Sequence, residues 1–292
     1  MRRLRLFTVA ALLLAVTSLA GTPVHVMVVN DDGISAPGIE AMARALAADP
    51  AYRVTVVAPM HQQSGVGHAL VIRRLIEVAP HDPVAGCTAW AVDATPATTA
   101  RVGLATILAD DPPALVISGI NRGENVGTVI WYSGTVGAAR EAALLGYPAM
   151  AVSLALDWGD PHPDYAAAAR WIKPVVDAVR EGGLPERTVL NVNVPKDPSK
   201  ARGYRLVRMS LVVDKDSSYE VIRREGGRRW LSGHWVPGVE TSPDADVAAL
   251  AAGWVTLTPL GIDQTAYRAY PGLEKLMRLE PPAPPAPAAP GP

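Results

Sequence analysis

The sequence predicts a three-layer α/β fold with a mainly parallel sheet. Short apolar runs rich in β-branched residues alternate with segments whose apolar residues recur at helical spacing. The runs are apolar throughout, as is typical of strands buried on both faces of a parallel sheet. With 49% hydrophobic residues in a chain of 292, there is enough apolar material for a large core. Helices covering both faces of such a sheet give three layers.

The first elements form a strand–helix–strand unit. Residues 24–29 (VHVMVV) are continuously apolar and predict a strand. A helix is expected from Pro37 to Asp49, because proline suits the first helical position and apolar residues follow at helical spacing. Residues 53–58 (RVTVVA) predict the second strand, which Pro59 closes. The three elements together have the length of a βαβ unit.

The rest of the body continues the alternation. Residues 69–79 and 88–93 are β-like runs that predict a hairpin. The further elements are, in chain order, a helix at 96–108, a strand at 114–118, a long loop at 119–133, a helix at 134–145, a strand at 149–154, a helix at 164–180 and a strand at 189–194. Residues 200–243 are less regular and predict a smaller subdomain or an oligomerisation arm. A helix at 244–252 and a strand at 254–258 follow.

Both ends of the chain lie outside the main domain, which we expect to span residues 21–270. Residues 1–20 combine a basic start, an apolar run and small residues before Gly21, which predicts a secretory signal peptide. An uncleaved membrane anchor is the alternative. Residues 281–292 hold seven of the 27 prolines and predict a disordered tail. We therefore expect an exported protein, periplasmic or secreted, that leaves the membrane once the signal is cleaved.

Composition excludes several classes of function. The formal net charge is −1 and becomes −4 when Arg2, Arg3 and Arg5 leave with the signal peptide, so no basic surface is expected for a nucleic-acid polymer. Cys87 is the one cysteine, which excludes a disulfide framework and a cysteine-based metal site. The sequence contains no P-loop, nucleophile elbow or HExxH zinc motif.

Three polar clusters follow predicted strands. They are Asn30-Asp31-Asp32 after the first strand, Gln62-Gln63-Ser64-Gly65 after the second and Asn121 after the strand at 114–118. Because ligands bind at the carboxyl ends of strands in such sheets, we expect these clusters to meet. Two carboxylates, a hydroxyl and an amide oxygen are hard ligands that suit Mg²⁺ or Mn²⁺. Taken singly, each cluster is better explained as ordinary turn or capping chemistry, and the metal-site interpretation depends on the three clusters together.

An anion site is predicted at the start of the helix at 134–145. Ser133 is a natural N-cap, and Gly134 lets an anion approach the exposed N–H groups closely. A phosphate there would meet the positive end of the helix, with Thr135 in its first turn. Plain helix capping is the alternative explanation for this segment.

The six histidines show no metal-ligand spacing. His25 lies within the first predicted strand, and we expect it to be buried with its ring nitrogens hydrogen-bonded. His61 and His68 flank the loop that carries Ser64, so they are within reach of a substrate bound there.

Four stretches of the chain carry long and specific motifs. They are residues 29–46 (VNDDGISAPGIEAMARAL), 57–70 (VAPMHQQSGVGHAL), 117–153 and 190–195 (LNVNVP), with a weaker fifth stretch at 244–260. Together these stretches resemble the SurE family of metal-dependent 5′/3′-nucleotidases, from about Val24 to Thr265. The resemblance implies a Rossmann-like α/β sheet with an extended β-hairpin. It also implies homodimers or homotetramers that form through exchanged arms.

By matching position, the resemblance implies a metal site and a phosphate site. One divalent cation per subunit, Mg²⁺ or Mn²⁺, would be bound by Asp31, Asp32, Ser64 and Asn121. The substrate phosphate would be bound by Asn30, Gly65, Ser133, Gly134 and Thr135. The residues expected to act in catalysis are Asn30, Asp31 and Asp32, with Asn30 orienting the phosphate or the attacking water.

The activity that the resemblance implies is hydrolysis of nucleoside 5′- and 3′-monophosphates. An exported acid phosphatase of broad specificity, acting on sugar phosphates or polyphosphate, is one alternative. A non-catalytic nucleotide-binding protein is the other. Met60-His61 stands where the family usually has Asp-Arg, and Gly261 stands where a His is often found. Neither departure removes an expected metal ligand, but both leave the substrate preference open.

Overall fold

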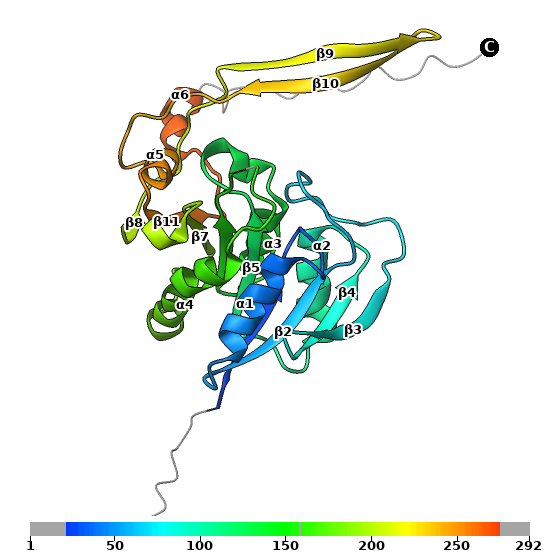
Figure 1. Cartoon of the computed structure of the whole chain (residues 1–292), viewed down its shortest axis with the longest axis vertical. Helices are drawn as coiled ribbons and strands as arrows, with labels where there is room; N and C mark the ends of the chain where they lie inside the picture. The colour runs from blue at the N-terminus through cyan, green and yellow to red at the C-terminus, as the bar shows by residue number, and fades with distance from the viewer. Residues whose placement is uncertain (1–21, 158, 275–292) are drawn as a thin grey trace, which may run out of the picture.

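The computed structural model describes residues 22–157 and 159–274. Its centre is a nine-stranded sheet with helices on both faces (Figure 1), which confirms the predicted three-layer α/β class. The strands of this sheet are β1 (Val24–Val29), β2 (Tyr52–Pro59), β3 (Val78–Val84), β4 (Cys87–Val92), β5 (Leu115–Arg122), β6 (Ala149–Leu154), β7 (Thr188–Val194), β8 (Tyr204–Leu206) and β11 (Val255–Gly261).

The helices alternate with these strands along the chain. The α-helices are α1 (Pro37–Ala47), α2 (Pro96–Val102), α3 (Gly134–Leu144), α4 (Tyr165–Gly182), α5 (Asp246–Ala251) and α6 (Tyr270–Leu273). Shorter helical turns are η1 (Gly103–Ile107), η2 (Gly127–Trp131), η3 (Pro198–Lys200) and η4 (Tyr267–Ala269). Because η1 continues α2 directly, the two together confirm the helix predicted at 96–108.

The strand order places β1 in the interior of the sheet, beside the middle strand β5. The order is β3-β4-β2-β1-β5-β6-β7-β11-β8, and the pairings of β1 with β2 and with β5 are both parallel. The chain therefore moves outward from β1 in both directions, and a crevice opens where the connections diverge at the strand ends. The β3–β4 and β7–β11 pairs are antiparallel, so the sheet is mixed but mainly parallel.

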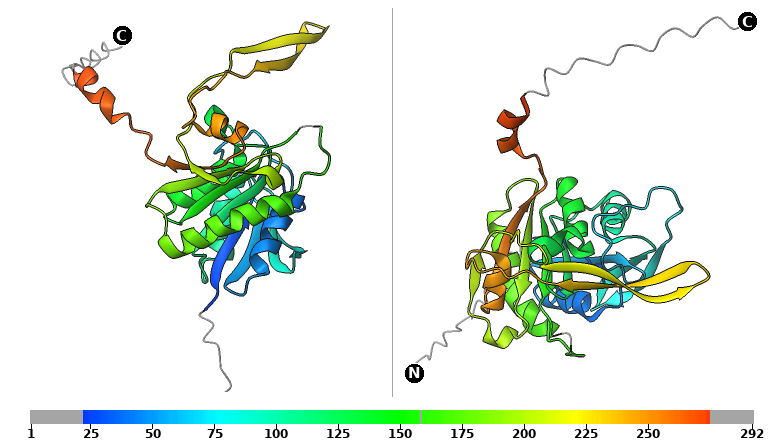
Figure 2. Two further views of the ribbon diagram at one scale, coloured as in Figure 1. Left: turned by 60° about the vertical axis from the view of Figure 1, so that its left-hand side comes forward. Right: turned by 90° about the horizontal axis from the view of Figure 1, so that it is seen from above.

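Two cores fill the space between the sheet and its helices. Val26 and Val28 of β1 belong to the core that packs against α1 and α4, whereas Met27 and Val29 belong to the core against α2 and α3. Figure 2 shows these helix pairs on opposite sides of the sheet. Neighbouring residues of β1 thus serve opposite cores, which explains why this run is apolar throughout.

The hairpin at the edge of the sheet begins later than predicted. Residues 69–77 form no strand, and the expected strand at 69–79 was wrong, because β3 spans Val78–Val84. Val71 donates its N–H to Thr98 Oγ1 at 2.8 Å, so the segment before β3 lies over α2 as a loop. Pro80 and Pro83 break the strand pattern in the sequence. They are tolerated because β3 is an edge strand.

Residues 200–243 contain a long arm. After β8, the strands β9 (Asp216–Glu225) and β10 (Arg228–Val236) pair antiparallel as a separate two-stranded sheet. Figures 1 and 2 show this hairpin projecting away from the body of the protein. The extended β-hairpin implied by the family resemblance is therefore present, as β9–β10. Whether it joins subunits stays a prediction.

The remaining expectations concern the chain ends. The signal peptide at 1–20 and the tail at 281–292 lie outside the described residues. No helix among residues 22–157 and 159–274 is both long and apolar enough to cross a membrane.

Candidate active site and metal centre

The predicted polar clusters meet at the carboxyl edge of the sheet. Asp31 and Asp32 follow β1, the loop with Ser64 follows β2, and Asn121 lies at the end of the neighbouring strand β5. The N-terminus of α3 faces the same crevice, since Thr135 contacts Asp31. Strand order alone brings these residues together, although they are spread over more than a hundred positions of sequence.

Asp31 is joined directly to the first turn of α3. The Thr135 hydroxyl donates to Asp31 Oδ1 at 2.5 Å, and both residues are buried. Gly134 lies so close that a Cβ atom at this position would stand 2.9 Å from Asp31 Oδ2. Any side chain at position 134 would therefore push the carboxylate away, so this position requires glycine for steric reasons.

Asp32 turns toward β5. Its Oδ2 accepts the backbone N–H of Arg122 at 3.0 Å, next in sequence to Asn121. Asn121 is 8% exposed, and its Nδ2 donates to the carbonyl oxygen of Gly123 at 2.8 Å. The amide is thus oriented by its nitrogen, so that its oxygen stays available as a ligand.

The loop after β2 is held by two contacts around Ser64. Gln63 donates its N–H to the backbone oxygen of Asp31 at 2.7 Å, and Gly67 donates to that of Tyr132 at 2.9 Å. Ser64 lies between these anchors with its side chain exposed. The backbone therefore carries the Ser64 hydroxyl to the crevice without a side-chain tether, and Gly65, also exposed, has a φ of +76°.

His68 closes this loop against α3. Its Nε2 lies 2.7 Å from Oε2 of Glu141, a carboxylate with no solvent exposure that also pairs with Arg101 of α2. Burial alone would raise the pKa of Glu141, but the His68 hydrogen bond and the Arg101 charge outweigh it and lower the pKa. His68 therefore contacts α3, and whether it also reaches a bound substrate stays a prediction.

Asn30 stabilises the turn that follows β1. Its Nδ2 donates to the carbonyl oxygen of Gly33 at 2.8 Å, and its Oδ1 accepts the N–H of Gly33 at 3.2 Å. The residue is fully buried, and both ends of its amide are used within the turn that presents Asp31 and Asp32. A direct contact between Asn30 and the phosphate stays a prediction.

The start of α3 has the geometry of an anion site. Ser133 is its N-cap, and its Oγ accepts the N–H of Val136 at 3.0 Å. Helix geometry leaves the N–H groups of Gly134 and Thr135 without an intrahelical acceptor. Those N–H groups and the helix dipole favour a negative group at this end of α3.

The two aspartates lie in an environment that disfavours their charge. Burial raises the pKa of Asp31 to about 6, although the hydrogen bond from Thr135 opposes the shift. Burial also raises the pKa of Asp32, against the opposing effect of Arg122. Two neighbouring carboxylates that resist ionisation are stabilised when a cation binds between them.

The donor set fits a hard divalent cation. The four predicted ligands offer two carboxylates, one hydroxyl and one amide oxygen, which is the chemistry preferred by Mg²⁺ and Mn²⁺. Within the part of the chain that the structure describes, no three His, Cys, Asp or Glu side chains cluster for a metal. The site depends on neutral oxygen donors beside its two carboxylates, and softer metals lack their preferred ligands there.

A cavity of about 350 Å³ adjoins Asp32. Its walls include Met60, Gln62, Arg122 and Tyr165. Burial raises the pKa of Tyr165 to about 12, so its hydroxyl stays protonated at neutral pH. The cavity lies on the α1 side of Asp32, opposite the contact between Asp31 and α3, and it offers room for the part of a substrate beyond its phosphate.

The profile of the family described as survival protein SurE matches residues 26–215. The chain belongs to the SurE family. Members of similar sequence are named 5′-nucleotidase SurE: one from Desulfatibacillum aliphaticivorans is 39% identical over 251 residues, covering 83% of this chain and 94% of the relative. Another from Symbiobacterium thermophilum is 40% identical over 245 residues, with the same two coverages.

The SurE protein of Aquifex aeolicus has a similar solved structure. It superposes with a TM-score of 0.75 and 32% identity, over 87% of this chain and 99% of the other. The SurE fold therefore extends over nearly all described residues, and the α/β sheet with its β9–β10 hairpin is a property of the family.

Sequence reasoning missed several residues that support the SurE site. The predicted site residues did not include Arg122, Tyr165 and Glu141. Arg122 donates its N–H to Asp32, Tyr165 lines the cavity beside Asp32, and Glu141 contacts His68 in the loop after β2. A buried glutamate within a helix of small residues is the one signal that the sequence offered, because an unpaired carboxylate is rarely buried.

Proposed function

We propose that the protein is a metal-dependent phosphomonoesterase that hydrolyses nucleoside 5′- and 3′-monophosphates. One observation carries the proposal: Thr135, in the anion-binding first turn of α3, donates to Asp31, a residue of the hard-ligand set. A cation and a phosphate held by these two elements would be neighbours. The name 5′-nucleotidase SurE carried by the relatives supports this substrate class.

The residues of the chain divide the work of such a reaction. Asp31, Asp32, Ser64 and Asn121 would hold a divalent cation, which when bound polarises a phosphoryl oxygen and lowers the pKa of a water molecule. The N–H groups of Gly134 and Thr135 would donate to the phosphate oxygens as their negative charge increases. Thr135 also fixes the Asp31 carboxylate, and Asn30 fixes the turn that presents both aspartates.

The cavity beside Asp32 supports a leaving group larger than phosphate alone. Its volume of about 350 Å³ lies within the range of small-molecule sites. Met60 offers a polarisable thioether, and Tyr165 offers an aromatic ring. These side chains favour a planar, largely uncharged group such as a nucleobase over a second phosphate.

The deciding experiment is phosphate release from AMP by residues 21–292, with Mn²⁺, with Mg²⁺ and with EDTA. We expect release with either cation and none with EDTA. Asp32→Asn should abolish release while leaving the circular dichroism spectrum unchanged. Asp110→Asn, at an exposed position remote from the site, is the matched control and should keep full activity.

A substrate panel separates the alternatives. AMP, ribose 5-phosphate and tripolyphosphate should be compared by kcat/KM, because the three share a phosphoryl group and differ in the leaving group attached to it. A preference for AMP supports the nucleotidase. Equal values would favour a phosphatase of broad specificity, and AMP binding without turnover would favour a non-catalytic relative.

We also propose that the arm joins subunits into a homodimer or homotetramer. Large apolar side chains of the arm are exposed: Tyr219, Ile222, Trp230, Leu231 and Trp235. An isolated two-stranded hairpin is marginal in water, and an exposed apolar surface of this kind is typical of an interface. Light scattering of the full protein and of a variant in which residues 214–238 are replaced by a short turn tests this; a monomeric full-length protein would contradict it.

Export is proposed from residues 1–20 alone. The basic start and the apolar run support cleavage before Gly21. Mass spectrometry of the protein recovered from the periplasm and from the medium would identify the new N-terminus and the compartment. An intact Met1 in the cytoplasmic fraction would contradict the proposal.

A further inference from the structure

One loop connects the metal site to the phosphate site. It comprises residues 123–132, including η2, and joins the end of β5, which carries Asn121, to Ser133, the N-cap of α3. Asn121 is a predicted metal ligand and Ser133 a predicted phosphate residue. Any movement of this connecting loop therefore changes the distance between the two parts of the site, and displacements of about 1 Å lower catalytic rates severely.

Asn125 is the first fixed point of the connecting loop. Its N–H donates to Asn193 Oδ1 at 2.8 Å, and its carbonyl oxygen accepts from Nδ2 of Asn193 at 3.2 Å and of Asn191 at 2.7 Å. Its own Nδ2 donates to Ser153 Oγ at 3.0 Å. The amide of Asn193 accepts from the N–H and donates to the carbonyl oxygen of the same residue, so Asn193 acts on the loop as a neighbouring strand would.

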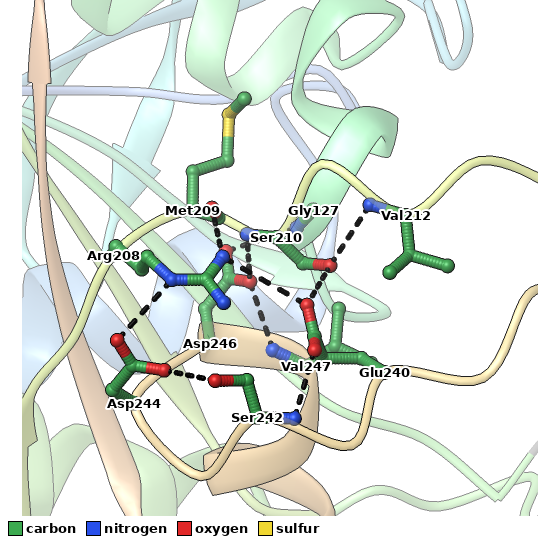
Figure 3. A network of polar contacts seen from close by, with 10 residues as sticks. All are labelled: Gly127, Arg208, Met209, Ser210, Val212, Glu240, Ser242, Asp244, Asp246 and Val247. Atoms are coloured by element: carbon green, nitrogen blue, oxygen red, sulfur yellow. Dashed lines mark hydrogen bonds and ion pairs between the residues drawn. The ribbon is translucent and has the colours of Figure 1, made fainter.

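Asp246 provides the second fixed point. Figure 3 shows its carboxylate between Gly127, Ser210 and Val247. Oδ2 accepts the N–H of Gly127 at 2.9 Å, and Oδ1 accepts those of Ser210 and Val247, each at 2.8 Å. Asp246 has no solvent exposure. Three N–H donors satisfy this buried carboxylate, and such charge-assisted hydrogen bonds are strong.

The same carboxylate also reaches the base of the arm. Ser210 follows β8 and its Oγ donates to Glu240 at 2.6 Å, so the two segments that lead into the arm are tied to each other there (Figure 3). Gly127 has a φ of +56°, and a Cβ atom at this position would lie 3.1 Å from Val247 Cγ2. The loop therefore passes so close to α5 that a side chain at position 127 would crowd Val247.

These buried polar contacts contribute less to the stability of the fold than apolar residues of the same volume would. Asn191, Asn193 and Asp246 are fully buried, and Asn191 Oδ1 has no hydrogen-bond partner within the described residues. Apolar residues of similar volume commonly pack a core at least as well as buried polar ones. Polar side chains that are kept inside a core and directed at one loop indicate that the position of this loop matters.

We propose that Asn193 and Asp246 are positioning residues, which hold the connecting loop so that Asn121 and Ser133 keep their places beside Asp31. Neither residue is among the predicted metal or phosphate ligands, and the contacts of both are with the backbone of the loop and of its neighbours. In this proposal, the LNVNVP segment and the segment that begins at Asp246 serve to hold the connecting loop in place. The inference rests on the proposed function where its readout is phosphate release.

The test compares Asn193→Val with Val192→Ala. Val192 neighbours Asn193 in β7 but faces the opposite core, against α1 and α4, so its truncation destabilises the fold without touching the loop. Measured quantities are the unfolding midpoint, the Mn²⁺ dissociation constant by calorimetric titration, and kcat and KM for AMP. Asn193→Val should raise the dissociation constant and lower kcat by about tenfold or more, with KM within about twofold. Val192→Ala should alter the unfolding midpoint alone.

A double-mutant cycle separates positioning from stability. In a protein that already carries Asn121→Ala, Asn193→Val should have no further effect on the Mn²⁺ dissociation constant, because the ligand that it positions is gone. The same fold-change in both backgrounds would overturn the proposal. Unfolding midpoints of the four proteins show that each is folded at the temperature of the titration.

Asp246→Asn provides an independent variant of nearly unchanged shape. It replaces one acceptor oxygen by a donor that faces a backbone N–H, and kcat should fall by about tenfold with the secondary structure intact. If the wild-type protein releases no phosphate from AMP, the proposed function fails. The inference is then decided by Mn²⁺ affinity alone: equal affinities of wild type, Asn193→Val and Asp246→Asn would overturn it.

Discussion

Thr135 donates its hydroxyl hydrogen to Asp31 across 104 positions of sequence, at 2.5 Å. The contact joins the end of β1 to the first turn of a helix on one face of the sheet. It fixes the Oδ1 atom of Asp31 and leaves Oδ2 beside Gly134. A predicted metal ligand and a residue of the predicted phosphate site, which the sequence places far apart, are thus joined by one hydrogen bond.

Thr135→Val should damage catalysis more than stability. The substitution keeps the shape of the side chain and removes the donor, which leaves the Asp31 carboxylate free to rotate. Hydrogen bonds to charged groups contribute about 1.5–3 kcal/mol, so we expect kcat/KM for AMP to fall by roughly tenfold to hundredfold. Thr135→Ser, which keeps the hydroxyl, is the control and should remain within about threefold of wild type. Equal losses in both variants would contradict the role of the hydrogen bond.

Asp31→Asn should stabilise the protein in the absence of metal. Burial raises the pKa of Asp31 to about 6 from an ordinary 3.8, so at pH 7 the folded state carries a charge that the unfolded chain tolerates better. At roughly 1.4 kcal/mol per pKa unit, removing the charge should raise the free energy of unfolding by about 1–3 kcal/mol. The gain should vanish as the pH falls below 4, where both states are protonated.

Thermal unfolding with and without Mn²⁺ checks this prediction. Mn²⁺ should raise the unfolding midpoint of the wild type, because it binds the folded state, and should have little effect on Asp31→Asn. A metal-free Asp31→Asn protein that unfolds at a lower temperature than wild type would mean that Asp31 supports the fold instead of straining it.

The central elements could be predicted from the sequence because their signals are local. The strand at 24–29 has the bounds of β1, since the apolar run stops abruptly at Asn30. The meeting of Asp31 and Asp32 with the loop after β2 and with the end of β5 followed from a general rule on where ligands bind in parallel sheets. No knowledge of side-chain contacts was needed for that step.

The edge hairpin and the asparagines that hold the connecting loop could not be predicted, because their structure depends on parts of the chain that are distant in sequence. Pro80 and Pro83 argue against a strand unless its place at the edge of the sheet is known. Asn191 and Asn193 interrupt an apolar strand, but their role depends on a loop 66–68 positions earlier. Contacts between residues so far apart in sequence are visible only in the folded chain, because no local sequence pattern encodes them.

The stability of the protein should fall below pH 6.5 because of His25. The ring is 5% exposed, with Nε2 2.9 Å from Thr55 Oγ1 and Nδ1 3.0 Å from the backbone oxygen of Asp111. Burial lowers the pKa of His25, Arg53 lowers it further, and Asp111 opposes both. Above pH 6.5 the ring is neutral in both states. Below it the unfolded chain binds the proton first, so the free energy of unfolding decreases as the pH falls from 6.5 toward the lowered pKa of the folded state and levels off beneath that pKa.

Urea unfolding between pH 5 and 8 measures this effect. His25→Gln should remove the part of the decrease that belongs to His25, and the difference from wild type isolates it from Asp31, whose raised pKa acts in the opposite direction. The matched control is His162→Gln, at an exposed loop position outside the arm, which should keep the wild-type pH dependence. An unchanged profile in His25→Gln would show that the buried ring is not the titrating group.

Met60 should determine preference for the leaving group. It lines the cavity beside Asp32, where the family usually carries an acidic residue, and an apolar side chain there favours contact with a nucleobase. Met60→Ala removes about 1–2 kcal/mol of apolar contact, so kcat/KM for AMP should fall by roughly fivefold to thirtyfold. Ribose 5-phosphate lacks the base and should be hydrolysed as by the wild type. Met209→Ala, remote from the cavity, is the matched control and should leave the ratio of the two substrates unchanged. Equal losses for both substrates in Met60→Ala would place the base elsewhere and leave Met60 with a role in packing alone.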